Sequence, residues 1–211
     1  MKRYFLFDLD NTLYLPDHGP LPQVDHLMNR FIVEKYQTSY PEAVQLRKDF
    51  CSRYGTTMEG LIRHFDIDPI EFLEYVHDVD PEHLPSEDRQ LQRIMAQIPW
   101  PKYVLTNSYR KYAQRVIRAL QIETYIDEVF DVVFMGLKNK IAPESYRLIM
   151  NHIDPESPPQ AFIMFDDLWI YLEAAHHLGL TTVLVNPTLS GHPTHHLKTI
   201  HELSGLLTRL D

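Results

Sequence analysis

Runs of apolar residues that do not alternate with polar ones are the feature that most restricts the fold of this chain. Short runs of this kind are typical of parallel strands, which are buried on both faces of a sheet. They predict strands at Tyr4–Phe7, Tyr103–Leu105, Val132–Phe134, Phe162–Phe165 and Thr182–Val185. Amphipathic helical stripes lie between the later runs. This alternation predicts a doubly wound, Rossmann-like α/β fold with a parallel sheet.

Residues 15–98 interrupt that alternation. They contain no convincing strand, several helical stripes and many prolines. One stripe consists of Val24, Leu27, Met28 and Phe31. We therefore expect an all-helical insertion, a cap, between the first two strands. The remaining residues, 1–14 and 99–211, form the expected catalytic core.

Composition narrows the classes of function. The formal net charge of −9 argues against general binding of nucleic acid, which relies on basic surfaces. Cys51 is the only cysteine, so no intramolecular disulfide can form and a reducing compartment is favoured. No run approaches the ~18 apolar residues of a membrane span, and the N-terminal run is too short for a signal peptide. We expect a cytoplasmic protein without a membrane partner.

Histidines gather near the C-terminus, in "HHLGL" and "GHPTHHLKTIH". We interpret them as an exposed polar face and tail rather than as metal ligands.

Polar residues follow each predicted strand at the point where it ends. In an open α/β sheet, ligands bind beyond the carboxyl ends of the strands, so these residues are expected to converge. They are Asp8, Asp10 and Thr12 after the first strand, Thr106, Asn107 and Ser108 after the second, Lys138 and Lys140 after the third, and Asp166 and Asp167 after the fourth. Asp8 and Asp10 lie so close together that either a positive charge compensates them or the stretch is a loop in water.

This set resembles the motifs of the haloacid dehalogenase-like superfamily of hydrolases. "DLDNT" is similar to its first motif and "VLTNS" to its second, while "KIAPESY" and "FDDLWIYLEAA" resemble the third and fourth. The resemblance covers the whole chain, because that superfamily places a helical cap of its first type where residues 15–98 lie. Within the cap, "YGTTMEGLIRHFDIDPIEFLEYVHDVD" resembles the pyrimidine 5'-nucleotidase branch.

The resemblance implies phosphoester hydrolysis, and the residues suit it chemically. Asp8 would attack phosphorus and form an aspartyl-phosphate that water then hydrolyses. Asp10 would protonate the leaving alkoxide and later activate that water. Thr106 and the backbone N–H groups around Asn107 would hold phosphate oxygens, and Thr12 is a further candidate for substrate binding.

The same resemblance implies a Mg²⁺ cofactor, which prefers hard oxygen ligands. Asp8, the backbone carbonyl of Asp10 and Asp167 would bind the ion, and Asp166 would either bind it or orient water. Lys140 would neutralise charge on the phosphoryl group. Lys138 is a competing assignment for this lysine, because Ile141 stands where a proline usually follows it.

A further departure lies in the fourth motif, where Tyr171 stands in place of another acid or Asn of many relatives. The expected substrate is a small phosphorylated metabolite, above all a pyrimidine nucleoside 5'-monophosphate. Tyr54, Met58 and His64 are the cap residues proposed to contact its base.

Two other functions remain open: a phosphatase for a sugar phosphate or another small metabolite, and a catalytically silent binding protein. A dehalogenase is less favoured, because hydrolytic dehalogenation has no need of Asp10. The expected assembly is a monomer or homodimer.

Overall fold

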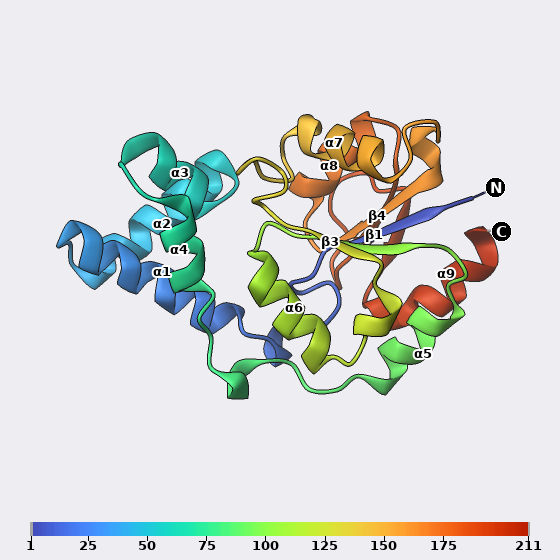
Figure 1. The fold of residues 1–211 in the computed structure, drawn as a ribbon, viewed down its shortest axis with the longest axis horizontal. Coiled ribbons are helices and arrows are strands. Elements are labelled where there is room, and N and C mark those ends of the chain that lie inside the picture. The colour runs from blue at the N-terminus through green and yellow to red at the C-terminus, as the bar shows by residue number, and fades with distance from the viewer. Residues whose placement is uncertain (1, 211) are drawn as a thin grey trace.

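The computed structural model describes residues 2–210 and contains one six-stranded parallel sheet of order β3-β2-β1-β4-β5-β6 (Figure 1). Its strands are β1 (Tyr4–Phe7), β2 (Lys102–Leu105), β3 (Glu128–Phe130), β4 (Phe162–Asp166), β5 (Thr181–Val185) and β6 (His195–Leu197). β1 lies in the middle, paired with β2 on one side and β4 on the other. The predicted doubly wound α/β fold is confirmed.

Helices cover both faces of the sheet (Figure 1). They are α5 (Arg89–Gln97), α6 (Arg110–Ala119), α7 (Pro143–Ile153), α8 (Trp169–His177) and α9 (Leu203–Leu210). Phe5 and Phe7 pack in the cluster that includes α5, α6 and α9, whereas Tyr4 and Leu6 pack with α7 and α8. Because β1 is buried on both faces, its sequence is apolar at every position.

One predicted strand is wrong. Residues Val132–Phe134 form turns, and β3 lies earlier, at Glu128–Phe130. The carboxylate of Asp131 explains the turn, because it accepts hydrogen bonds from the backbone N–H of Phe134 and of Arg110, both at 2.9 Å. An aspartate that binds the backbone two or three residues on favours a turn over a continued strand.

The histidine-rich tail is also more ordered than expected. His195–Leu197 forms β6, which pairs in parallel with β5. His196 Nε2 lies 2.7 Å from the carbonyl oxygen of Asn186, which anchors the strand. Leu197 is the only buried residue of these three, so the strand carries little apolar signal.

Four helices of the insertion pack on one another: α1 (Leu21–Tyr36), α2 (Tyr40–Tyr54), α3 (Thr57–His64) and α4 (Pro69–Val76). Local signals define their ends. Ser39 and Glu42 form a capping box at α2, and Asp68 caps α4 through the N–H of Ile70 at 2.8 Å. Figure 1 shows these helices beside the sheet, joined to it by two linkers.

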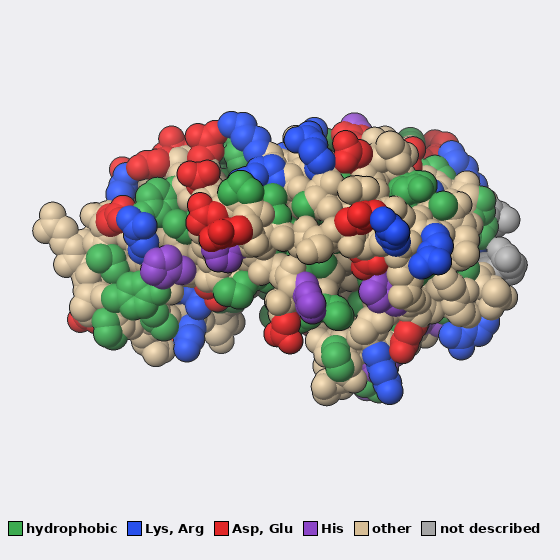
Figure 2. Space-filling model, turned by 90° about the horizontal axis from the view of Figure 1, so that it is seen from below, with side chains coloured by type: hydrophobic (Ala, Val, Ile, Leu, Met, Phe, Trp, Pro, Cys, Tyr) green, Lys and Arg blue, Asp and Glu red, His purple; other side chains and the backbone are tan. Residues whose placement is uncertain are grey.

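The fifth helix of the predicted insertion lies elsewhere. α5 contacts α9 and the short helix η5 (Ile200–Glu202) rather than α1–α4. Its apolar residues Leu91, Ile94 and Met95 belong to the cluster beneath the sheet. We therefore propose a cap of α1–α4 and a core that includes α5. The view from below shows the two parts as lobes with a narrow waist (Figure 2).

None of the helices within residues 2–210 combines the length and apolar character needed to cross a bilayer.

Candidate active site

The ends of three neighbouring strands bring the predicted polar residues together. Asp8 follows β1, Thr106 follows β2 and Asp166 ends β4. Asp8 is 5% exposed, Thr106 1% and Asp166 0%, so these three polar side chains are buried. The backbone N–H of Asp8 donates to the carbonyl oxygen of Phe165 at 2.8 Å, which continues the β1–β4 pairing to the acid itself.

Lys140 is buried between two of these acids. Its Nζ donates to Asp166 Oδ2 at 2.6 Å and also contacts Asp8 Oδ1. The side chain of Asn107 holds the lysine in place by accepting from its backbone N–H at 3.0 Å. Lys138, the competing candidate, is exposed. The structure thus brings Lys140, and not Lys138, to the acids.

Asp8, Asp166 and Asp167 place carboxylate oxygens within 4.8 Å of one another. Burial, followed by the other acids, raises the pKa of Asp167 to about 8. Burial also raises the pKa of Asp166 to about 7 and that of Asp8, although Lys140 opposes both shifts. Lys140 alone therefore does not balance the negative charge of the three carboxylates. A hard dication fits a set of three clustered carboxylates, and Mg²⁺ is the usual ion for such ligands.

The two acids of the fourth motif differ in their partners. Asp166 uses Oδ2 for Lys140 and Oδ1 for the backbone N–H of Leu168, at 2.9 Å. Asp167 is only partly buried and lines the cavity described below. Asp167 is therefore the better placed of the two to bind an ion directly.

Asp10 lies among hydroxyl groups. Tyr112 donates to its Oδ1 at 2.6 Å, Tyr14 donates to the same oxygen, and Ser108 donates to Oδ2 at 2.8 Å. Burial and the nearby Asp10 raise the pKa of Tyr14 and of Tyr112 far above the usual range, so both phenols keep their protons.

Of these three hydroxyl residues, Ser108 was expected at this edge from the sequence, whereas Tyr14 and Tyr112 were not assigned to the site. Tyr112 belongs to an apolar helical stripe and was indistinguishable from a core residue. Tyr14 follows Asp10 by one helical turn, which is the one local signal that could have suggested a contact.

The two threonines lie in the predicted loops. Thr12 Oγ1 donates to Asp8 Oδ2 at 3.2 Å. Thr106 Oγ1 accepts from the backbone N–H of Ser108 at 3.0 Å and so shapes the turn after β2. Both side chains are buried.

A cavity of about 250 Å³ lies between this edge and the cap. Asp8, Asp10, Thr106, Lys140 and Asp167 line it from the core. The cap contributes an apolar wall that includes Met28, Met58, Phe72 and Leu73. The charged side chains that line it from the cap are Asp25 and Arg47, which form an ion pair at 2.8 Å, and Thr56 and Thr57 line it as well.

Of the three cap residues proposed from the sequence, Met58 alone lines this cavity. Tyr54 and His64 contact each other through Tyr54 Oη and His64 Nε2, and the His64 ring stacks on Phe50 with centroids 5.2 Å apart. The prediction is wrong for these two, because their side chains serve the packing of α2 on α3.

The two departures from the family motifs meet at one glycine of the cap. Tyr171 Oη donates to the carbonyl oxygen of Gly55 at 2.9 Å. A Cβ on Gly55 would lie 2.1 Å from Ile141 Cδ1, and the φ of +85° at this residue also favours glycine. Asn139 adds a hydrogen bond to the carbonyl oxygen of Tyr54 at 3.0 Å. These contacts hold the loop between α2 and α3 against the core.

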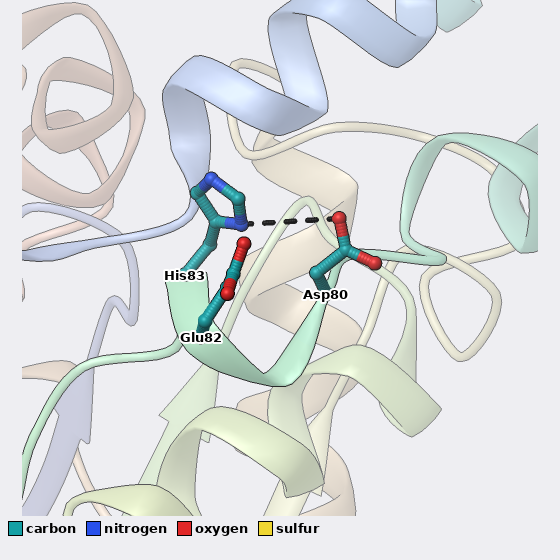
Figure 3. A group of neighbouring side chains, drawn as sticks. All are labelled: Asp80, Glu82 and His83. Atoms are coloured by element: carbon teal, nitrogen blue, oxygen red, sulfur yellow. Dashed lines mark ion pairs between the residues drawn. The ribbon is translucent and has the colours of Figure 1, made fainter.

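A second group with metal-ligand chemistry, Asp80, Glu82 and His83, lies on the return linker (Figure 3). All three are exposed, and His83 Nδ1 lies 4.0 Å from Asp80 Oδ2. Gln23 Nε2 donates to Asp80 Oδ2 at 2.6 Å. Water and Gln23 can satisfy these groups, so their arrangement does not require an ion.

A match to the haloacid dehalogenase-like hydrolases covers residues 2–179. The chain belongs to this family. Phosphate metabolism protein 8 of Saccharomyces cerevisiae is a relative that is 27% identical over 142 residues, or 61% of this chain and 43% of that protein. The chain thus spans less than half the length of that curated relative.

Solved structures of similar fold include several bacterial proteins. CbbY of Rhodobacter sphaeroides, solved with phosphate, has a TM-score of 0.71 at 15% identity over 96% of each chain. YfnB of Bacillus subtilis, solved with magnesium, has a TM-score of 0.66 at 14% identity over 99% of each chain. L-2-haloacid dehalogenase of Xanthobacter autotrophicus has a TM-score of 0.63 at 13% identity over the full length of both. This likeness shows the fold, and the reaction must be argued from the site.

Proposed function

We propose that this protein is a Mg²⁺-dependent phosphomonoesterase that forms an aspartyl-phosphate on Asp8. One observation carries the proposal: two aspartates of different surroundings, Asp8 against Lys140 and Asp10 among hydroxyls, line the same cavity. Such a pair suits a nucleophile that must stay ionised and an acid–base group that must exchange a proton.

In the first half of the reaction, a carboxylate oxygen of Asp8 attacks phosphorus. The bond between phosphorus and the ester oxygen breaks, and protonated Asp10 gives its proton to the leaving alkoxide. Lys140 stays within reach of the Asp8 carboxylate and offsets negative charge there.

In the second half, Asp10 removes a proton from a water molecule, whose oxygen attacks phosphorus. The bond between phosphorus and Asp8 breaks, inorganic phosphate is released and Asp10 is protonated again. The atoms and protons of the two halves balance to one water consumed per ester.

The Mg²⁺ would be held by Asp8, Asp167 and the backbone carbonyl of Asp10. Asp166 would not bind it directly, because its carboxylate accepts a hydrogen bond from Lys140. The bound ion supplies positive charge for the phosphoryl oxygens. This assignment agrees with the raised pKa of Asp167, since a dication would favour its ionised form.

For the substrate, we propose a pyrimidine nucleoside 5'-monophosphate. Met28, Met58 and Phe72 offer apolar and aromatic surface on which a flat base can pack. Arg47 and Asp25 provide a donor and an acceptor near the same wall. A sugar phosphate is the second candidate. It fits the cap less well, because its hydroxyl groups would face the apolar wall.

The catalytically silent alternative is less well supported, because the full set of Asp8, Asp10, Lys140 and Asp167 lines one cavity. A dehalogenase is disfavoured because it would have no use for an acid held as Asp10 is.

The experiment is a phosphate-release assay with purified protein on nucleoside monophosphates, sugar phosphates and para-nitrophenyl phosphate, each with Mg²⁺ and with EDTA. We expect hydrolysis that requires Mg²⁺ and a higher kcat/KM for pyrimidine nucleotides. Absence of release from every ester would refute the phosphatase, and a preference for sugar phosphates would refute the substrate class. Light scattering would check the predicted monomer or homodimer.

A further inference from the structure

The carboxylate of Asp10 is fixed by side chains that have no charge of their own. Tyr14 and Tyr112 both donate to Oδ1, and their rings are 6% and 1% exposed. A carbonyl-type oxygen accepts two hydrogen bonds, so the two phenols occupy Oδ1 fully. Oδ2 has Ser108 as its partner at 2.8 Å, and a serine hydroxyl can either donate or accept.

This division of the two oxygens has a chemical consequence. Oδ2 is the oxygen that can carry the proton, because a protonated Oδ1 would meet two phenol donors. Protonated Asp10 keeps its hydrogen bonds to both tyrosines and donates through Oδ2. The phenols therefore fix the orientation of the acid and select the oxygen that exchanges the proton.

Each tyrosine is in turn packed against a different cap linker. On the outgoing linker, a Cβ added to Gly19 would lie 1.9 Å from Tyr14 Cε2, so this glycine gives the ring its room. On the return linker, the buried His77 ring packs on the Tyr112 ring with centroids 4.7 Å apart. The two linkers thus fix the two rings that hold Asp10.

The return linker is also tied to the start of α1 and to the core. Gln23 Nε2 donates to Asp80 Oδ2 at 2.6 Å, and Gln23 Oε1 accepts from the backbone N–H of Asp80 at 2.9 Å. Arg115 of α6 donates to the carbonyl oxygen of Val79. A shift of the cap would therefore reach both tyrosines through their linkers.

We infer that Tyr14 and Tyr112 are positioning residues for Asp10 and that the cap linkers, through Gly19 and His77, set their position. The inference rests on the proposed function, because it needs Asp10 as the proton donor to the leaving group. It predicts that removal of either tyrosine hydroxyl lowers kcat/KM only for esters whose leaving group must be protonated.

The test compares two esters in Tyr14→Phe and Tyr112→Phe. A nucleoside 5'-monophosphate releases an alkoxide that must be protonated, whereas para-nitrophenolate leaves without protonation. The ratio kcat/KM covers binding and the steps up to departure of the leaving group, so it excludes the later hydrolysis of the aspartyl-phosphate. We expect kcat/KM for the nucleotide to fall ~10- to 100-fold and that for para-nitrophenyl phosphate to change less than ~3-fold.

Gly19→Ala tests the linker without removing a hydroxyl. Its φ of −131° accepts alanine, so the effect comes from the contact with Tyr14 alone. We expect the same selective loss on the nucleotide, somewhat smaller than in Tyr14→Phe. Tyr75→Phe is the matched control, because it removes a phenol that bonds Glu34 within the cap at 2.9 Å. It should change neither ester.

Equal losses on both esters, or no loss on either, would overturn the positioning role. Thermal unfolding identifies a variant that does not fold, and a crystal structure of Gly19→Ala then decides: an unmoved Asp10 side chain would also overturn the inference. An inactive wild-type protein would instead overturn the proposed function, which separates the two failures.

Discussion

The polar edge of the sheet and the cap wall face the same cavity but are built in opposite ways. The edge concentrates buried charge, with Lys140 1% and Asp166 0% exposed. The wall is apolar, and its ion pair between Arg47 and Asp25 is partly exposed. Charges at the edge depend on one another, because each would be costly without its partner. Side chains of the wall contribute mainly by shape. In the proposed function, the edge therefore carries out the reaction and the wall selects the substrate.

The sharpest test of the edge is Asp8→Asn, which removes the nucleophile with little change of shape. We expect turnover to fall by at least ~10³-fold on every ester. Steady-state kinetics on a nucleotide and on para-nitrophenyl phosphate measure this loss, and circular dichroism checks the fold. A loss of a few-fold would show that another group attacks phosphorus.

Lys140→Ala should have the next largest effect. It leaves Asp8 and Asp166 buried without their partner, so we expect ~10²-fold lower kcat and unfolding that is easier by ~3–5 kcal/mol. Lys138→Ala is the matched control, because its side chain is exposed. Denaturant unfolding and kinetics of both variants compare the lysines. An inactive Lys138→Ala with an active Lys140→Ala would reverse the assignment.

On the wall, Met28→Ala should act selectively. This side chain is partly buried and lines the cavity, so its loss should lower nucleotide kcat/KM ~5- to 10-fold, because about 1–1.5 kcal/mol of apolar contact is lost. The value for para-nitrophenyl phosphate should stay nearly constant. His64→Ala serves as the control, because its ring stacks on Phe50 outside the cavity. Equal losses on both esters in Met28→Ala would remove the support for a base on this wall.

Cys51 offers a measurement of binding without turnover. It is the only cysteine, it lines the cavity, and it is exposed, so a maleimide can reach its thiol. In Asp8→Asn, we expect a nucleotide to slow alkylation of Cys51 by maleimide several-fold and inorganic phosphate to leave it unchanged. Equal protection by both would mean that the nucleoside does not reach the cap.

The last prediction concerns stability at acid pH rather than activity. Burial lowers the pKa of His77 to about 4, below its usual 6.5. The unfolded chain therefore takes up a proton before the folded protein does, so stability present above pH 6.5 is lost as the pH falls towards 4. This one residue accounts for ~3 kcal/mol. Urea unfolding of wild type and His77→Gln at pH 7 and pH 4.5 should show a steeper loss in the wild type. Parallel losses would contradict the assignment.

The sequence predicted the edge well because two signals agreed: each motif lies at or after the end of a predicted strand. β1 was placed correctly, and Asp8, Thr106 and Asp166 do follow neighbouring strands. The wall was predicted poorly, because only Met58 of the three proposed residues lines the cavity. Helical periodicity shows that a side chain is buried, but it does not distinguish burial in the cap from burial beside a substrate.

Local sequence patterns did not predict the contacts between segments that are distant in the chain. Tyr112 looked like any apolar member of its helix, yet its hydroxyl reaches Asp10. β6 carried one buried residue, and Asp131 turned an apolar run away from the sheet. In each case a hydrogen bond of a polar group determined the local structure, whereas the prediction had relied on the pattern of apolar residues.

The central place of β1 also has a consequence for how the protein is made. β1 is synthesised before both of its partners, which begin at Lys102 and Phe162, so both pairings close long loops. The helices of the cap contact near neighbours in the chain and can form while the ribosome is still working. We expect "YFLF" to remain unpaired on the nascent chain until β2 has emerged, and to keep one free edge until β4 has emerged, so chaperones would act on this stretch.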